Sequence, residues 1–123
     1  MLTTTKTVED LRLLEAADIA ERNSEYNQRT FKNDHGTPGC MLGGYAAAHP
    51  EDFSFILGCP RLRNGKTAKD HENYFGLQSD EWAELFDYVG CGNAGRDGKK
   101  AAAYVRAFVE RRALARIAAE TSK

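Results

Sequence analysis

The stretch that decides the fold reads Thr37-Pro38-Gly39-Cys40-Met41-Leu42-Gly43-Gly44-Tyr45-Ala46-Ala47-Ala48-His49-Pro50. Thr37 is a suitable N-cap, and Pro38 suits the first helical position because its missing N–H would have no partner there. Pro50 cannot continue a helix, so the spacing predicts a helix over 38–49. Its glycines and alanines give small faces that another backbone can approach closely. We therefore expect this helix to be buried at the centre of the molecule.

Further helices are expected on both sides of this segment. Thr7 and Asp10 have the spacing of a capping box, Thr67 and Asp70 repeat that spacing, and Ser79 is a suitable N-cap. Apolar residues then recur at the helical period in the longer segments. The expected helices cover 8–22, 67–75, 80–88 and the stretch from about 97 toward the C-terminus.

A short β-hairpin is expected between the second and third helices. Residues 53–57 alternate in the manner of a strand, and Asn64-Gly65 is typical of a two-residue hairpin turn. Pro60 lacks an N–H and so restricts any strand here to an edge. The sequence predicts a hairpin over roughly 53–68.

Length and composition set the overall class. The chain has 123 residues, of which 41% are hydrophobic and 28% are charged, enough for one modest core. We predict a mainly α protein, a single compact domain over 1–123 with about five helices and a small β-hairpin. The segments 1–6 and 114–123 are expected to fray, because the apolar pattern thins at both ends.

The cysteines and the hydropathy pattern bear on the compartment. Cys40, Cys59 and Cys91 are odd in number and widely spaced, which favours free thiols over a disulfide framework. No run approaches the ~18 apolar residues that a bilayer requires, and the N-terminus lacks the apolar stretch of a secretory signal. We expect a cytoplasmic protein with no membrane contact.

Charge is unevenly distributed along a chain whose net charge is −1. Residues 1–59 carry 5 basic and 9 acidic side chains, whereas residues 96–123 carry 8 basic and 3 acidic ones. A basic C-terminal helix can contact nucleic acid or an acidic partner. Alternatively, the positive charge complements the helix dipole.

Cys40 is the first candidate for chemistry. If Thr37 caps the helix, Cys40 lies in its first turn, where unpaired N–H groups and the positive end of the dipole favour a thiolate. His35 lies close before the cap and could serve as its base. The alternative is a small buried residue that packs a glycine-rich helix.

The second candidate is a phosphate site after residue 90. Gly90-x-Gly92-x-x-Gly95 matches the letters of a dinucleotide fingerprint but follows a helix rather than a strand, so we interpret it as a turn. Arg96, Lys99 and Lys100 could surround a phosphate at the next helix N-terminus. Because no C-x-x-C or H-x-x-x-H pair is present, the sequence predicts neither a metal site nor a cofactor.

Several stretches together resemble a family of small proteins from bacteriophages and their hosts. Gly36-Thr37-Pro38-Gly39-Cys40-Met41-Leu42-Gly43-Gly44-Tyr45-Ala46 is similar to that family's C-G-T-x-x-C-x-x-G-x-A segment, with His35 in place of its first cysteine. Tyr74-Phe75-Gly76-Leu77 resembles its F-G-L piece, and Ala101–Val109 its terminal helix. The resemblance implies a phage or prophage accessory setting, where small proteins commonly bind host machinery.

These observations lead to one functional expectation and two alternatives. We expect a binding protein rather than an enzyme, acting on a host protein or complex in the bacterial cytoplasm, for example as an inhibitor of a host defence such as a CRISPR complex. One alternative is a binder of a phosphate-bearing small molecule or nucleotide signal. The other is a cysteine-dependent enzyme that uses Cys40. The candidate site residues are His35, Thr37, Cys40, Arg96, Lys99 and Lys100.

Overall fold

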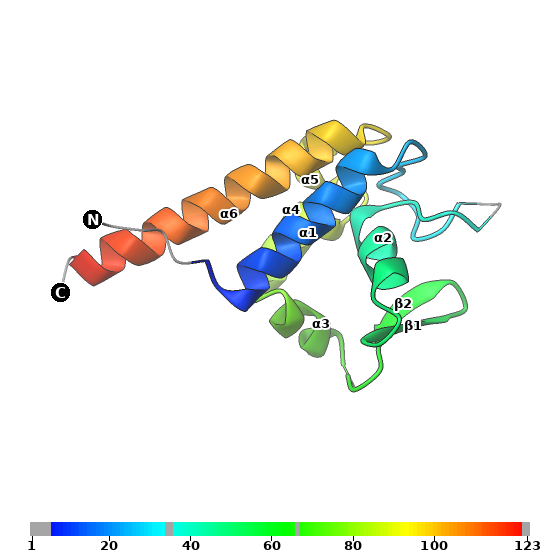
Figure 1. The fold of residues 1–123 in the computed structure, drawn as a ribbon, viewed down its shortest axis with the longest axis horizontal. Coiled ribbons are helices and arrows are strands. Elements are labelled where there is room, and N and C mark those ends of the chain that lie inside the picture. The colour runs from blue at the N-terminus through cyan, green and yellow to red at the C-terminus, as the bar shows by residue number, and fades with distance from the viewer. Residues whose placement is uncertain (1–5, 34–35, 66, 122–123) are drawn as a thin grey trace.

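The computed structural model describes residues 6–33, 36–65 and 67–121 of the chain, and Figure 1 shows their arrangement. The mainly α fold with a small antiparallel hairpin is confirmed. The elements, in chain order, are α1 (Val8–Arg22), α2 (Met41–Ala48), β1 (Phe53–Ile56), β2 (Cys59–Leu62), α3 (Ala68–Tyr74), α4 (Ser79–Phe86), α5 (Gly90–Asn93) and α6 (Gly98–Thr121).

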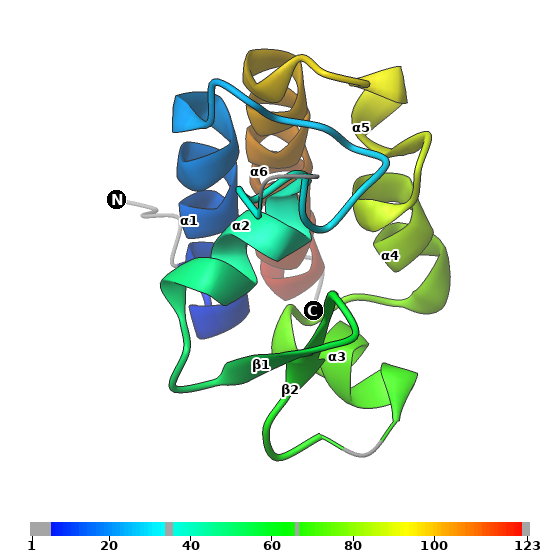
Figure 2. The same ribbon diagram turned by 90° about the vertical axis from the view of Figure 1, so that its right-hand side faces the viewer.

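Helices α1 and α6 lie side by side and antiparallel, as Figures 1 and 2 both show. The capping box of Thr7 and Asp10 begins α1 as expected. One leucine and three alanines on one face of α1 are buried, and the helix packs on α6. Gly98 allows the closest approach, because a Cβ there would lie 2.2 Å from the carbonyl oxygen of Ala20. The two helices form the frame on which the other elements pack.

The central position of α2 is confirmed. Residues 41–46 are all buried. A Cβ on Gly43 would lie 2.1 Å from the carbonyl oxygen of Phe31, and one on Gly44 would lie 2.8 Å from Cγ2 of Ile19. The small residues therefore let α2 pack between α1 and the preceding connecting segment, which we call the strap (residues 24–33).

The start of α2 differs from the prediction. The helix begins at Met41 with Cys40 as N-cap, so Thr37 and Pro38 lie outside it. Pro38 instead forms a bridge with Lys32. The amides of Gly39 and Cys40 donate to the carbonyls of Phe31 and Thr30 (3.0 and 2.7 Å), which holds this stretch extended along the strap.

The hairpin is present, but its turn lies earlier than predicted. Leu57-Gly58 forms the turn, and Asn64-Gly65 follows the second strand. The observed register places Phe53 opposite Leu62 and Phe55 opposite Pro60 on one face of the hairpin. A turn at 64–65 would lose these pairs. Pro60 does lie in an edge strand, as expected, because the sheet has two strands.

The remaining boundaries differ by small amounts. Gln78, not Ser79, is the N-cap of α4. The glycine-rich break after it is the distorted turn α5, in which Cys91 and Gly92 have positive φ. The last helix runs through Thr121, and residues 1–5 and 122–123 lie outside the described residues. The expected fraying of 1–6 and 114–123 stays a prediction. Among the described helices, none combines the length and apolar character needed to cross a membrane.

Candidate functional site

Cys40 lies in a setting that favours the thiol over the thiolate. Its side chain is 3% exposed. Burial raises its pKa, although the backbone amides of Gly43 and Leu42 act in the opposite direction. A thiol with a raised pKa is a poor nucleophile at neutral pH. Cys40 packs in the hydrophobic core, as the alternative of a small buried residue requires. His35, the expected base, lies outside the described residues.

Thr37 closes the loop after the strap and does not cap a helix. Its backbone carbonyl accepts a hydrogen bond from the amide of Asn33 (2.8 Å), and its hydroxyl accepts one from Asn33 Nδ2 (3.2 Å). Asn33 Nδ2 also donates to the carbonyl of Glu25 (2.9 Å). The role of Thr37 is therefore to fix the shape of the strap.

Arg96 lines a surface cleft of about 470 Å3 that the strap forms with the turn before α6. The lining is mostly polar and includes Lys32, a second cation. Its residues are Ser24, Glu25, Tyr26, Asn27, Thr30, Lys32, Asn33 and Arg96. The ammonium of Lys32 also lies 4.2 Å from the centre of the Phe55 ring, so the cleft and the hairpin are adjacent.

Lys99 and Lys100 do not join Arg96 in lining this cleft. Both are exposed in the first turn of α6. That helix start already has an anionic cap, because Asp97 Oδ1 accepts a hydrogen bond from the amide of Lys100 (3.0 Å). A carboxylate at this position competes with a phosphate for the same helix N-terminus. The structure thus brings one of the three predicted phosphate ligands to a cleft.

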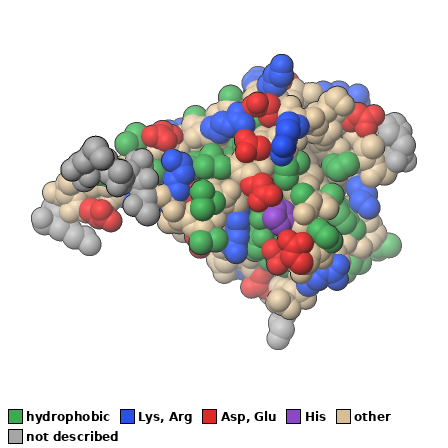
Figure 3. Space-filling model, viewed as in Figure 1, with side chains coloured by type: hydrophobic (Ala, Val, Ile, Leu, Met, Phe, Trp, Pro, Cys, Tyr) green, Lys and Arg blue, Asp and Glu red, His purple; other side chains and the backbone are tan. Residues whose placement is uncertain are grey.

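The arginines of α6 are largely paired within the molecule. Arg106 forms ion pairs with Asp18 (2.7 Å) and Glu21 on α1, and Arg112 pairs with Asp10 (2.5 Å). Figure 3 shows basic and acidic side chains intermixed over these helices. The uneven charge seen along the sequence is therefore compensated by the pairing of α1 with α6.

The tip of the hairpin was not recognised as a site from the sequence. Leu57 is 100% exposed, the highest value among the large hydrophobic side chains that the structure describes, and its neighbour Ile56 is 57% exposed. Leu57 and Gly58 have φ of 53° and 80°, which gives the two-residue loop the positive dihedrals of a type I′ turn. Asparagine, aspartate or glycine normally occupies the first position, and leucine there is a genuine outlier.

The sequence offers one signal for this turn, the glycine at position 58, whereas our prediction rested on Asn64-Gly65. Figures 1 and 2 place the hairpin at the margin of the molecule, beside α2 and α3. Comparison with known proteins finds no matching family model, no matching curated protein and no matching solved structure.

Proposed function

We propose that this protein is a non-enzymatic binding protein that docks on a host macromolecule through its hairpin tip. The observation that carries the proposal is Leu57, a fully exposed leucine in the left-handed region of the backbone. Both features cost free energy in the isolated chain, and asparagine at this position would avoid both. Residues in strained backbone conformations are concentrated at functional sites, and Ile56 adds a second exposed apolar side chain next to Leu57.

The chemistry of the tip suits a protein partner. A leucine side chain that enters an apolar pocket contributes about 1.5–3 kcal/mol. The two-residue turn places Leu57 beside Ile56 at the tip, and a short turn has few residues to order on binding, which lowers the entropic cost. We place this activity in a phage-type accessory protein of the bacterial cytoplasm, and an inhibitor of a host defence complex such as CRISPR is the specific form we favour.

Leu57→Asn separates binding from folding. Asparagine tolerates positive φ, so we expect the free energy of unfolding to rise by about 0.5–1 kcal/mol while the apolar anchor is lost. Capture of the host partner by the immobilised variant should fall roughly 10–100-fold relative to wild type. Leu114→Asn is the matched control, because Leu114 is an exposed leucine (53%) on α6, away from the hairpin.

Three results would count against this proposal. One is equal capture by wild type and Leu57→Asn, and another is loss of capture in the Leu114→Asn control alone. The third is a fall in stability for Leu57→Asn, which would mean that the leucine side chain serves the fold. Chemical denaturation and quantitative pull-down from a bacterial lysate provide both measurements.

The cleft beside the strap favours a second candidate function. Lys32 and Arg96 line a polar space of about 470 Å3, the size of a small-molecule site. A phosphate-bearing ligand would find two cations and several hydrogen-bonding side chains there. Thermal-shift measurements with a nucleotide panel test this: Arg96→Ala should abolish any stabilisation, and Lys99→Ala, outside the cleft, should retain it.

A further inference from the structure

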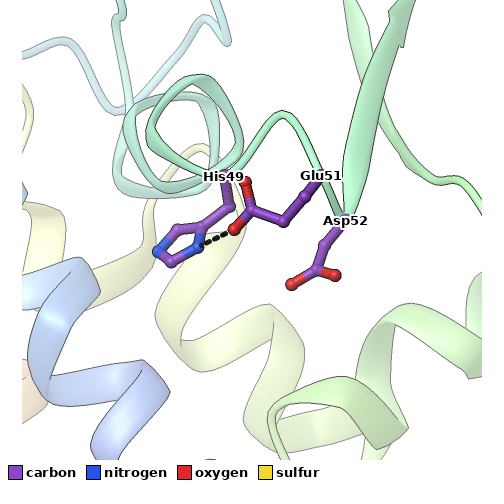
Figure 4. A group of neighbouring side chains, drawn as sticks. All are labelled: His49, Glu51 and Asp52. Atoms are coloured by element: carbon purple, nitrogen blue, oxygen red, sulfur yellow. Dashed lines mark hydrogen bonds and ion pairs between the residues drawn. The ribbon is translucent and has the colours of Figure 1, made fainter.

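A second cluster of chemistry-bearing side chains lies at the base of the hairpin, in the turn that joins α2 to β1. His49, Glu51 and Asp52 each place one ligand atom within 4.8 Å of the other two. Figure 4 shows the imidazole and both carboxylates facing the same small space. The three residues are intermediate or exposed, so solvent reaches them.

The imidazole is held in one orientation by groups from two other elements. Its Nε2 lies 2.7 Å from a carboxylate oxygen of Glu15 on α1. Its ring stacks on Tyr45 of α2, with centroids 4.2 Å apart and an interplanar angle of 20°. The other ring nitrogen, Nδ1, lies 2.9 Å from a carboxylate oxygen of Glu51, so each ring nitrogen faces one carboxylate. A histidine oriented by an outer carboxylate in this way is the usual arrangement of a metal-ligating imidazole.

Asp52 is also fixed from outside the turn. The hydroxyl of Tyr74 donates to Asp52 Oδ2 (3.0 Å), and the hydroxyls of Tyr74 and Tyr45 lie 2.9 Å apart. Two of the three ligand groups are thus positioned before any ion arrives, His49 by Tyr45 and Glu15 and Asp52 by Tyr74. A pre-positioned ligand set loses less entropy on binding than a flexible one.

We propose that His49 Nδ1, Glu51 and Asp52 bind a divalent transition metal ion of the Zn2+ class, with Glu15 as the positioning residue. The ion would replace the proton shared between Nδ1 and Glu51. Metal bonds of about 2 Å at tetrahedral angles place ligand atoms about 3.3 Å apart, so Nδ1 and the Glu51 oxygen, now 2.9 Å apart, would separate slightly, while any pair near the 4.8 Å limit would move closer. An imidazole nitrogen with carboxylates suits Zn2+ and disfavours Mg2+ and Ca2+, which prefer all-oxygen sites. The bound ion would hold the turn between α2 and β1 at the base of the hairpin, with Glu15 on α1 contacting the ligand His49 from outside.

Calorimetric titration of the purified chain with Zn2+, paired with thermal unfolding, tests the site. We expect one Zn2+ per chain, a rise in melting temperature that EDTA reverses, and a much smaller response to Mg2+ or Ca2+. Glu51→Gln should weaken Zn2+ binding at least tenfold; its side chain is 63% exposed, so the apo fold should persist. His49→Gln should abolish binding at the same Zn2+ concentrations.

Two further variants separate ligation from general stability. Glu15→Ala should weaken affinity by roughly 10–100-fold, and Glu15→Gln, which can still accept the Nε2–H bond, should restore most of it. His71→Gln is the control, because His71 lies on α3 outside the cluster and should leave Zn2+ affinity unchanged.

Three outcomes would overturn the proposal: no Zn2+ binding by wild type, unchanged affinity in both Glu51→Gln and His49→Gln, or equal stabilisation by Ca2+. None of these measurements depends on the hairpin tip, so this site and the proposed function succeed or fail separately.

Discussion

At the scale of single residues, Gly43 shows most directly how the sequence sets the packing. Its missing side chain lets α2 meet the backbone of Phe31, where an added Cβ would lie 2.1 Å from the carbonyl oxygen. A real Cβ cannot occupy that space, so the strap would have to move away from the helix. Phe31 lies between Thr30 and Lys32, which both line the cleft, so a shift of the strap at Phe31 would also change the shape of the cleft.

Gly43→Ala should therefore destabilise the protein in spite of the better helix propensity of alanine. We expect the free energy of unfolding to fall by about 1–3 kcal/mol, the usual cost of overpacking. Urea denaturation measures this directly. Ala47→Ser, at an exposed position of the same helix, should change stability by less than about 0.5 kcal/mol. Equal changes in the free energy of unfolding for the two substitutions would contradict this prediction, because they would mean that the strap can move away from Gly43 at little cost.

Cysteine reactivity gives a second residue-scale prediction. Burial raises the pKa of the Cys40 thiol, whereas Cys59 is partly exposed in the hairpin. Iodoacetamide at neutral pH should alkylate Cys59 first and reach Cys40 only as the protein unfolds. Peptide mass spectrometry over time distinguishes the sites. Rapid alkylation of Cys40 in the folded protein would revive the cysteine-enzyme alternative.

Residue-level reasoning from the sequence succeeded where the cause was local. Small residues at Gly43 and Gly44 predicted a close backbone approach, and the spacing of Thr7 and Asp10 predicted a capping box. It failed at Thr37, whose cap role was lost because the amides after it pair with the strap instead. The strap residues that accept these bonds, Phe31 and Thr30, lie eight and ten residues earlier in the chain, beyond the three or four residues that an N-cap pattern covers.

At the scale of elements, Asp10 joins the start of α1 to the second half of α6. Its carboxylate is 0% exposed, accepts a hydrogen bond from the amide of Thr7, and pairs with Arg112 and Arg116. Arg112 Nη1 also donates to the carbonyl of Gly76 (2.7 Å), so the cluster reaches the turn after α3. Burial alone would raise the pKa of Asp10, but its hydrogen bonds and the nearby guanidinium groups lower it.

A lowered carboxyl pKa has a definite sign in the stability of the fold. The stabilisation is fully present above the unfolded-state pKa of about 3.9 and is lost as the pH falls through the lower folded-state pKa. Asp10→Asn should lower the free energy of unfolding by about 2–4 kcal/mol at neutral pH. The difference from wild type should shrink in acid below about pH 4, as urea denaturation across this range would show. A difference that is constant with pH would contradict the role of the ionised carboxylate.

The hairpin illustrates the limit of element-scale prediction. Its existence and edge character followed from alternation and from Pro60, but its turn did not. Asn64-Gly65 was the stronger local signal, whereas the observed register pairs Phe53 with Leu62 and leaves the turn to Leu57-Gly58. Side-chain pairing across the strands outweighed turn propensity. The contact of His49 with Glu15 also depends on tertiary structure. It forms only because α2 packs on α1, so neither segment alone predicts it.

At the scale of the whole molecule, acidic side chains of α1 and basic side chains of α6 form ion pairs that connect the two helices. Asp18 and Glu21 on α1 pair with Arg106 on α6, so part of the positive charge of the C-terminal segment is compensated within the molecule. The most exposed large apolar side chain among the described residues is Leu57 at the tip of the hairpin. Several charges of α1 and α6 are paired with each other, whereas the hairpin tip exposes apolar side chains. This arrangement favours docking on a protein over electrostatic binding of a polyanion.

Hydrogen exchange on the free chain and on its complex with the captured partner tests the docking claim most directly. Binding through the tip predicts slower exchange of the amides at residues 56–58, with the exposed outer faces of α1 and α6 unchanged. Leu57→Asn, at equal concentrations, should show no such slowing. Slower exchange confined to the cleft side of the strap and to Arg96, with the tip unaffected, would contradict the account and move the interface to the cleft.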